Sequence, residues 1–183
     1  MQGEGVRAAA RAYGNQGHSL PLGRREITEV ERLKGGRNPE PYPGGSGVEH
    51  FVRALFHDTY NRRDLSAIDR AYATTVRWHG GSLREGYGRA DVRRMARALM
   101  ATFPDLGLHV DEVYWMGDEA AGFSVSVRWT ATGTHRGYAL YGEPTGRRVH
   151  LWGLNQLYIK DGEITEEWAL FNEFDVLAQL LRD

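Results

Sequence analysis

The chain has 183 residues, no cysteine, and 23 lysines and arginines against 24 aspartates and glutamates. Without cysteine it has no disulfide framework, thiol nucleophile or thiolate metal site, and its balanced charge gives no drive toward nucleic acid or an anionic membrane. No apolar run approaches the roughly 18 residues of a membrane span, and the N-terminus lacks the apolar core of a signal peptide. We therefore expect a cytoplasmic protein with neither a nucleic acid nor a membrane as partner.

Residues 1–47 differ from the rest of the chain, because they are rich in glycine and arginine and poor in apolar runs. The stretch NPEPYPGGSG at 38–47 ends them with three prolines and three glycines, which is typical of a linker. Upstream, Ile27, Val30 and Leu33 have the spacing of one short helix. We expect 1–47 to be an N-terminal extension or linker, partly disordered, outside the core of the protein.

From residue 48 onward, apolar residues recur with the spacing of helices. The stretch 48–61 carries one apolar stripe, and Ser66 and Asp69 are spaced as a capping box at the start of a second, short helix. The stretch 89–103 is the clearest helix, because apolar residues line one side and arginines the other. Its apolar stripe consists of Val92, Met95, Ala96, Leu99 and Phe103.

Elsewhere the apolar period is two, which predicts β-strands. In the stretch 121–133, for example, Val125, Val127 and Trp129 alternate with polar residues. The Asp-Gly pair at 161–162 predicts a tight hairpin turn. The predicted strands are 74–80, 106–116, 121–133, 149–160 and 164–171, and a final helix is predicted at 172–181.

The order of these elements predicts the fold class. Helices come first, long strands follow, and a small helix closes the chain, which favours an α+β fold with a strongly curved, mostly antiparallel sheet and helices packed on its concave side. A bent sheet of this kind is shaped like a cone, and alternate strand residues line the pocket inside it. Asn155 shares its strand face with Leu151 and Gly153, so it is a candidate pocket residue, whereas Trp152 faces the other way.

Six short motifs connect this pattern with a known family. They are VRWHGG (76–81), FPD (103–105), TGTHRG (132–137), PTGRRV (144–149), DGEITEEW (161–168) and LAQLL (177–181). In this order and spacing they resemble the SnoaL-like polyketide cyclase and ester cyclase family of the nuclear transport factor 2-like superfamily. The resemblance implies a cone-shaped nuclear transport factor 2-like fold, with residues 48–183 as one SnoaL-like domain.

The resemblance also implies where chemistry takes place. The better-known cyclases of the family use a histidine on the penultimate strand and an aspartate just after the tryptophan, and the aspartate is the general acid/base, without metal or cofactor. In this chain those positions hold Asn155 and Ala169. Asparagine holds a substrate oxygen but exchanges no proton at neutral pH, and alanine does neither. If the protein is an enzyme, another residue supplies the acid or base.

Two residues are catalytic candidates. Glu167 shares a strand face with Ala169, about 6.5 Å along the strand, and aromatic walls around it would raise the pKa of its carboxyl group toward a useful value. The alternative for Glu167 is a strand-end glutamate in solvent. His79 precedes a glycine turn where the family often has a histidine, and it is either an acid/base or substrate-binding group or a structural residue that holds the turn.

The aromatic residues indicate which ligand the pocket would hold. As a wall they suit a flat, apolar, ring-bearing molecule, and the alternative for each is a place in the core or in the dimer interface. No two histidines are spaced i,i+4 or i,i+2, so we expect neither a metal nor a cofactor. A homodimer through the outer face of the sheet follows from the habits of the fold. The substrate-binding candidates are Asn155, Trp78, Trp129, Tyr141, His109 and Trp168.

Two functions fit these residues. The first is a cofactor-free acid/base enzyme, of the cyclase, isomerase or hydrolase type, acting on an apolar, carbonyl-bearing metabolite. The second is a non-catalytic ligand-binding or interaction module of the same fold. A carboxylate or imidazole at the deepest point of the cone, near Asn155, would favour the enzyme.

Overall fold

The computed structural model describes residues 47–81 and 83–181, so nearly all of the predicted extension 1–47 lies outside the described residues. The helical elements of the described part are α3 (Val48–Phe56), the π-helical turn η1 (His57–Asn61), α4 (Ser66–Ala71), α5 (Gly88–Thr102) and α6 (Glu173–Leu181). The strands are β1 (Tyr72–Gly80), β2 (Arg84–Tyr87), β3 (Gly107–Asp118), β4 (Gly122–Thr134), β5 (Arg148–Lys160) and β6 (Glu163–Phe171).

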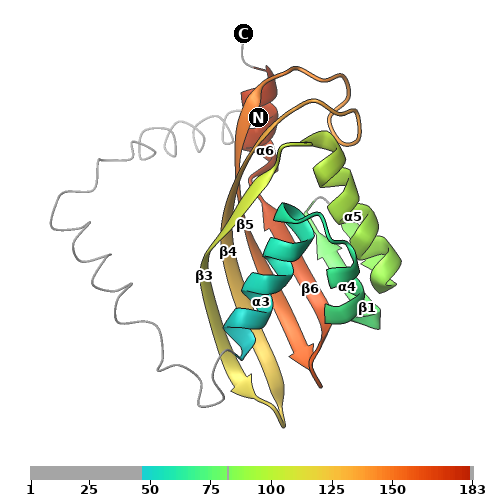
Figure 1. Cartoon of the computed structure of the whole chain (residues 1–183), viewed down its shortest axis with the longest axis vertical. Coiled ribbons are helices and arrows are strands. Elements are labelled where there is room, and N and C mark those ends of the chain that lie inside the picture. Colours follow the sequence, from blue (N-terminus) through green and yellow to red (C-terminus); the bar gives the residue numbers. More distant parts are fainter. Residues whose placement is uncertain (1–46, 82, 182–183) are drawn as a thin grey trace, which may run out of the picture. The chain divides into compact units, whose positions relative to one another are not determined.

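The strands form one curved, open sheet in the order β2-β1-β6-β5-β4-β3. Neighbouring strands are antiparallel except β1 and β6, which run parallel. Figure 1 shows α3, α4 and α5 over one face of this sheet. The predicted α+β fold, with a mostly antiparallel sheet and helices on its concave side, is confirmed.

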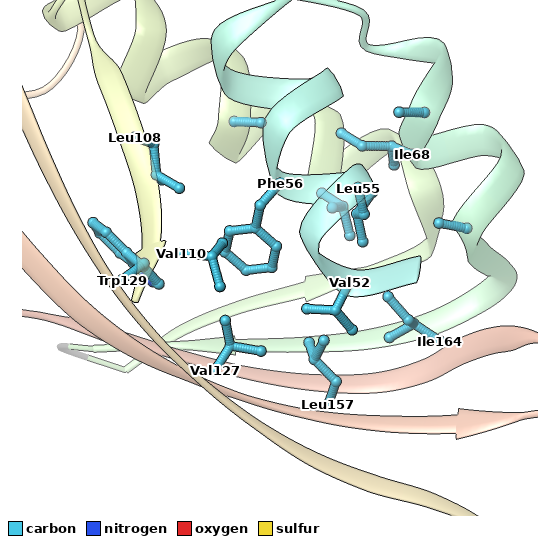
Figure 2. Packing of buried hydrophobic residues seen from close by; sticks show 14 of the residues in the cluster. Val52, Leu55, Phe56, Ile68, Leu108, Val110, Val127, Trp129, Leu157 and Ile164 are labelled. Carbon is cyan, nitrogen blue, oxygen red and sulfur yellow. The ribbon is translucent and has the colours of Figure 1, made fainter. Parts of the chain in front are cut away.

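The hydrophobic core fills the space between these helices and the inner face of the sheet. In Figure 2, Val52 and Phe56 of α3 point toward Val127 of β4 and Leu157 of β5. All four side chains are almost completely removed from water. Burial of one such side chain stabilises the fold by about 1.5–3 kcal/mol, so the alternating pattern of the strands fixes which face meets the helices.

Three features go beyond the sequence expectations. Strand β2 has only four residues and follows a turn in which Leu83 has a positive φ of 59°. The predicted helix 48–61 changes type at His57, since the Arg62 N–H donates to the His57 carbonyl oxygen over 3.0 Å, five residues back. The parallel pairing of β1 with β6 joins the first strand to the last, and no local pattern predicts it.

The predicted hairpin turn at 161–162 is confirmed. Asp161 and Gly162 both have positive φ, 53° and 78°, as a two-residue turn of type I′ requires. This turn and a register shift between Tyr158 and Ile159 together set the pairing of β5 with β6, in which Asn155 pairs with Ala169 and Leu157 pairs with Glu167. Asn155, Glu167 and Ala169 therefore share the inner face of the sheet.

Candidate functional site

A cavity of about 90 Å³ lies between the helices and the inner face of the sheet. Its walls come from α3, η1, α4 and α5 on one side and from all six strands on the other. Most of the lining side chains are apolar, among them Leu55, Ile68, Met95, Leu99, Leu108 and Phe171. The cone therefore encloses a hollow, and Asn155 projects into it.

The polar centre of the cavity is the carboxyl group of Glu167, which is only 3% exposed. The Tyr72 hydroxyl donates a hydrogen bond to Glu167 Oε2 over 2.8 Å, and the Asn155 amide Nδ2 donates to Glu167 Oε1. The Trp129 indole Nε1 donates to Asn155 Oδ1 over 2.7 Å. Both carboxyl oxygens are thus held by fixed donors, and a chain of four side chains spans β4, β5, β6 and β1.

The orientation of the Asn155 amide follows from the chemistry of its neighbours. An indole nitrogen only donates, so the amide group must present its oxygen to Trp129. The amide NH₂ then points at Glu167, where it meets an acceptor. Trp129 therefore positions Asn155, and Asn155 in turn positions the carboxyl group.

Burial raises the pKa of Glu167 above its ordinary value, and the hydrogen bonds from Tyr72 and Asn155 offset part of that effect. The pKa values of Tyr60 and Tyr72 are also raised, mainly by burial and then by the charge of Glu167. Both phenols therefore keep their protons near neutral pH, and that of Tyr72 donates to Glu167. The cavity holds a carboxyl group with an elevated pKa and two neutral phenols.

The turn η1 carries two of the hydroxyl groups that line the cavity. Tyr60 and Thr59 are consecutive residues, and both belong to the lining. Within the described part of the chain, the buried Thr59 hydroxyl has no hydrogen-bond partner. A π-helical turn is wider than an α-helical one and is frequent at functional sites.

Two tryptophans of the cavity wall pack against glycines, where any side chain would collide with the indole ring. Trp129 lies across from Gly153 on the neighbouring strand, and a Cβ atom on Gly153 would stand 2.3 Å from the ring atom Cζ2. Trp78 covers Gly80 in the same way, where a Cβ atom would stand 2.3 Å from Cη2. A side chain at Gly153 would displace the indole that holds Asn155.

The structure brings together four of the eight residues singled out in the sequence. Glu167, Asn155, Trp78 and Trp129 all line the cavity. Glu167 is buried, not exposed to solvent at a strand end. It lies beside Asn155, which is where an acid/base group was expected if the protein is an enzyme.

His79 and Trp168 lie on the outer face of the sheet, away from the cavity. The His79 ring stacks on Trp168 with 4.1 Å between ring centres. Its Nδ1 lies 2.6 Å from Glu85 Oε2, and its Nε2 lies 3.0 Å from Glu166 Oε1. These contacts tie β1 to β2 and β6, which agrees with the structural interpretation of His79.

The two remaining candidates also lie outside the lining. His109 is exposed on β3, between the buried residues Leu108 and Val110. The Tyr141 ring packs near the core, and its hydroxyl donates to Glu173 Oε1 over 3.3 Å. Burial raises the pKa of Tyr141, and the neighbouring charge of Glu173 adds to that effect.

Sequence reasoning missed four polar residues of the lining: Thr59, Tyr60, Tyr72 and Arg84. Tyr60 lies four residues after Phe56 on the predicted stripe 48–61, so helical spacing gave a usable signal. Tyr72 and Arg84 carry no such signal, because their places in the cavity depend on pairing between strands distant in sequence.

Among residues 47–81 and 83–181, no group of three or more histidine, aspartate or glutamate side chains is arranged to hold a metal ion. In the same part of the chain, none of the helices has the length and apolar character needed to cross a bilayer.

The family model of the SnoaL-like polyketide cyclases matches residues 50–180. No protein with a curated description matches the chain.

Solved structures similar to this chain include AclR from Streptomyces galilaeus, named as a hydroxylase, with 26% identity and a TM-score of 0.61 over 72% of this chain and 93% of AclR. IdmH from Streptomyces antibioticus, named as a polyketide cyclase, has 26% identity and a TM-score of 0.59 over 72% of this chain and 96% of IdmH. A protein from Jannaschia sp. CCS1, named as a SnoaL-like polyketide cyclase, has 19% identity and a TM-score of 0.70 over 80% of this chain and 99% of its own.

Proposed function

Because this chain belongs to the SnoaL-like polyketide cyclase family, we propose that it binds a small, mostly apolar, carbonyl-bearing molecule in the cavity and transfers a proton on it with Glu167. The names of AclR and IdmH describe two different reactions, a hydroxylation and a cyclisation. Since one fold hosts many activities, the argument for a reaction class rests on the residues in the cavity.

The observation that carries the proposal is the buried carboxyl group of Glu167 inside an apolar cavity. Resemblance to the family puts the usual acid/base position at Ala169, and Glu167 lies two residues earlier on the same strand face. Its raised pKa brings the carboxyl group nearer to neutral pH, where a general acid/base is most effective. The carboxyl group that projects into the hollow thus lies two residues before the position that the resemblance implies.

The proposed step is a proton transfer next to a carbonyl group. Ionised Glu167 takes the proton from the carbon beside the ligand's carbonyl, and the C–H electron pair becomes the carbon–carbon double bond of an enolate. The negative charge moves onto the carbonyl oxygen. Protonated Glu167 then returns the proton to carbon or oxygen, so the protein ends unchanged and no oxidant is needed.

The test measures deuterium uptake from D₂O by 2-tetralone, a small apolar ketone with acidic hydrogens beside its carbonyl group. We expect the protein to accelerate uptake, and Glu167→Gln to lower the rate by about 10²–10⁴-fold, which is the range for loss of a general acid/base. Glu166→Gln is the matched control, since Glu166 is adjacent to Glu167 in the chain but lies on the outer face of the sheet. Its rate should equal that of the unmodified protein.

Two other outcomes would contradict proton transfer by Glu167. If 2-tetralone binds and no uptake is accelerated, the cavity is a receptor and the second, non-catalytic function replaces the first. If Glu167→Gln keeps the full rate, another group moves the proton. Native mass spectrometry of the purified protein would identify a retained ligand in either case.

The proposal includes a homodimer formed through the outer face of the sheet. Trp152, Leu154 and Trp168 lie on the outer face of the neighbouring strands β5 and β6 and are each about half exposed. A two-fold axis through such a face would bury the same apolar side chains from both copies. Light scattering is expected to give twice the chain mass, and Trp152→Lys is expected to give the monomer mass. A monomer mass for the unmodified protein would refute the dimer.

A further inference from the structure

The cavity has one basic side chain as well as an acidic one. Among the described residues that line it, Arg84 alone is basic and Glu167 alone is acidic. Glu167 is almost fully buried, whereas the Arg84 side chain is 34% exposed. The polar groups of the cavity are therefore divided between a buried carboxyl group and a more accessible guanidinium group.

Three distant segments meet around Arg84. The guanidinium Nη2 of Arg84, at the start of β2, donates to Glu173 Oε1 at the start of α6. The Tyr141 hydroxyl, from the loop between β4 and β5, donates to the same oxygen. Leu140 of that loop lines the cavity too, together with Gly81 before β2 and Leu170 of β6. Arg84 thus sits in a built polar cluster beside apolar walls.

The guanidinium group of Arg84 has donors to spare. It carries five N–H bonds in a fixed plane, and in the described part of the chain a single one, on Nη2, makes a hydrogen bond. A carboxylate accepts two parallel N–H bonds from one guanidinium group, and such charge-assisted pairs are stronger than neutral ones. Because Arg84 belongs to the lining, a ligand in the cavity can contact this side chain.

We propose that Arg84 binds a carboxylate of the ligand, while the ligand's carbonyl group lies against Glu167. This inference rests on the proposed function and narrows its substrate class to apolar keto acids, with the acid group and the reacting carbonyl at opposite ends. Arg84 then decides specificity and orientation, and Glu167 moves the proton.

Glu173 limits the affinity of Arg84 for a ligand carboxylate, because its own carboxylate competes for the same guanidinium group. Removing the charge with Glu173→Gln keeps an oxygen that accepts from Tyr141 and Arg84, and it leaves the guanidinium charge uncompensated. Acid binding is then expected to become tighter. A change at Arg84 and a change at Glu173 should therefore move acid affinity in opposite directions, which a general loss of packing would not do.

The experiment compares 2-naphthoate with 2-naphthamide, two probes of the same shape that differ in charge, by isothermal titration calorimetry at pH 7.5. The unmodified protein is expected to bind the acid about 10–100-fold more tightly than the amide, since charge-assisted bonds exceed neutral ones by roughly that factor. Arg84→Met, which keeps the apolar stem, should lose this preference and keep its affinity for the amide. Glu173→Gln should increase the preference.

The matched control is Arg77→Met. Arg77 lies in β1, next to β2, and like Arg84 it forms an ion pair with a glutamate, in this case Glu166 at 2.9 Å. Unlike Arg84, it lies on the outer face of the sheet. Arg77→Met should leave the affinities for 2-naphthoate and 2-naphthamide unchanged. Arg84→Lys should retain part of the preference for the acid, because it retains the positive charge.

Three results would overturn the inference. Equal affinity for acid and amide in the unmodified protein refutes the acid site and leaves the proposed function untouched. A preference for the acid that persists in Arg84→Met also refutes the acid site at Arg84 and leaves the proposed function untouched. If neither probe binds while 2-tetralone still takes up deuterium through Glu167, the acid site is wrong and proton transfer stands. If neither probe binds and 2-tetralone takes up no deuterium, both the acid site and proton transfer by Glu167 are refuted.

Discussion

Glu166 and Glu167 are neighbours in the chain, but the two faces of β6 give them opposite surroundings. Glu167 is buried between Tyr72 and Asn155 in an apolar cavity, and burial raises its pKa. Glu166 faces outward, where it pairs with Arg77 and contacts His79. The same side chain is thus a candidate acid/base on one face and part of an ion-pair cluster on the other.

On the inner face, burial therefore disfavours the charged form of a carboxyl group, and on the outer face ion pairs keep the carboxylate charged at little cost. A buried carboxyl group without a cation beside it costs free energy in the folded state, and proteins retain such groups where they serve a function. Exposed ion pairs contribute little in either direction. Substitutions on the two faces of the sheet should therefore differ in their effects on stability.

Gly153→Ala should have the largest effect on stability. The new Cβ atom would collide with the Trp129 ring and with the Leu170 carbonyl oxygen, so we expect a loss of about 1–3 kcal/mol, as for overpacked cores. Thermal melting checks this, with Gly107→Ala as the control, since no atom lies within 4 Å of the corresponding position there. Equal melting temperatures for the two variants would contradict the packing of Trp129 over Gly153.

Tyr72→Phe removes a hydrogen bond that lowers the pKa of Glu167, so that pKa should rise further. The charged carboxylate loses a donor, and the expected loss is about 1–3 kcal/mol at a pH where Glu167 is ionised. At pH 4.5 the loss should be smaller. Urea unfolding at both pH values tests this, with Tyr158→Phe on the outer face as control. A pH-independent loss would mean that Tyr72 acts through packing alone.

Glu167→Gln should raise the melting temperature by a few degrees at high pH, because it removes the buried charge. The folded pKa of Glu167 lies above its ordinary value of 4.5, so the unfolded chain releases its proton first as the pH rises. The unmodified protein therefore loses stability between pH 4.5 and the folded pKa, and the variant does not. The gap in melting temperature should widen with pH, and a gap that narrows would refute the assignment.

His79→Gln should have the smallest effect. His79 contacts two carboxylates and stacks on Trp168 at the outer face, where such contacts contribute about 0–1 kcal/mol. Deuterium uptake by 2-tetralone should remain at the rate of the unmodified protein. A large loss of uptake with an unchanged melting temperature would return His79 to the catalytic role that the sequence left open.

Much of the fold was predictable because local patterns agree with the tertiary structure. Alternation along β5 and β6 places Asn155, Glu167 and Ala169 on one face, and the register of the hairpin puts them together. Alternation also contained a signal that sequence reasoning did not use. Trp78 faces the cavity, so its neighbour His79 faces outward, and the same holds for Glu167 and Trp168.

The rest of the site depends on contacts that no local pattern encodes. Tyr72 reaches Glu167 across 95 residues through the parallel pairing of β1 with β6. Arg84 joins the cavity through a four-residue strand too short to show a period. The extension 1–47, the independence from cofactors and the cytoplasmic location stay predictions.

The parallel pairing of β1 with β6 also determines when the site forms during synthesis. A ribosome makes Tyr72 early and Glu167 only after the other five strands, so an unfinished chain lacks the proposed acid/base group. Until β6 docks beside β1, the hollow under the helices lacks part of its floor and lies open to chaperones or solvent. Docking of β6 beside β1 therefore both brings Glu167 into the cavity and closes the cavity against water.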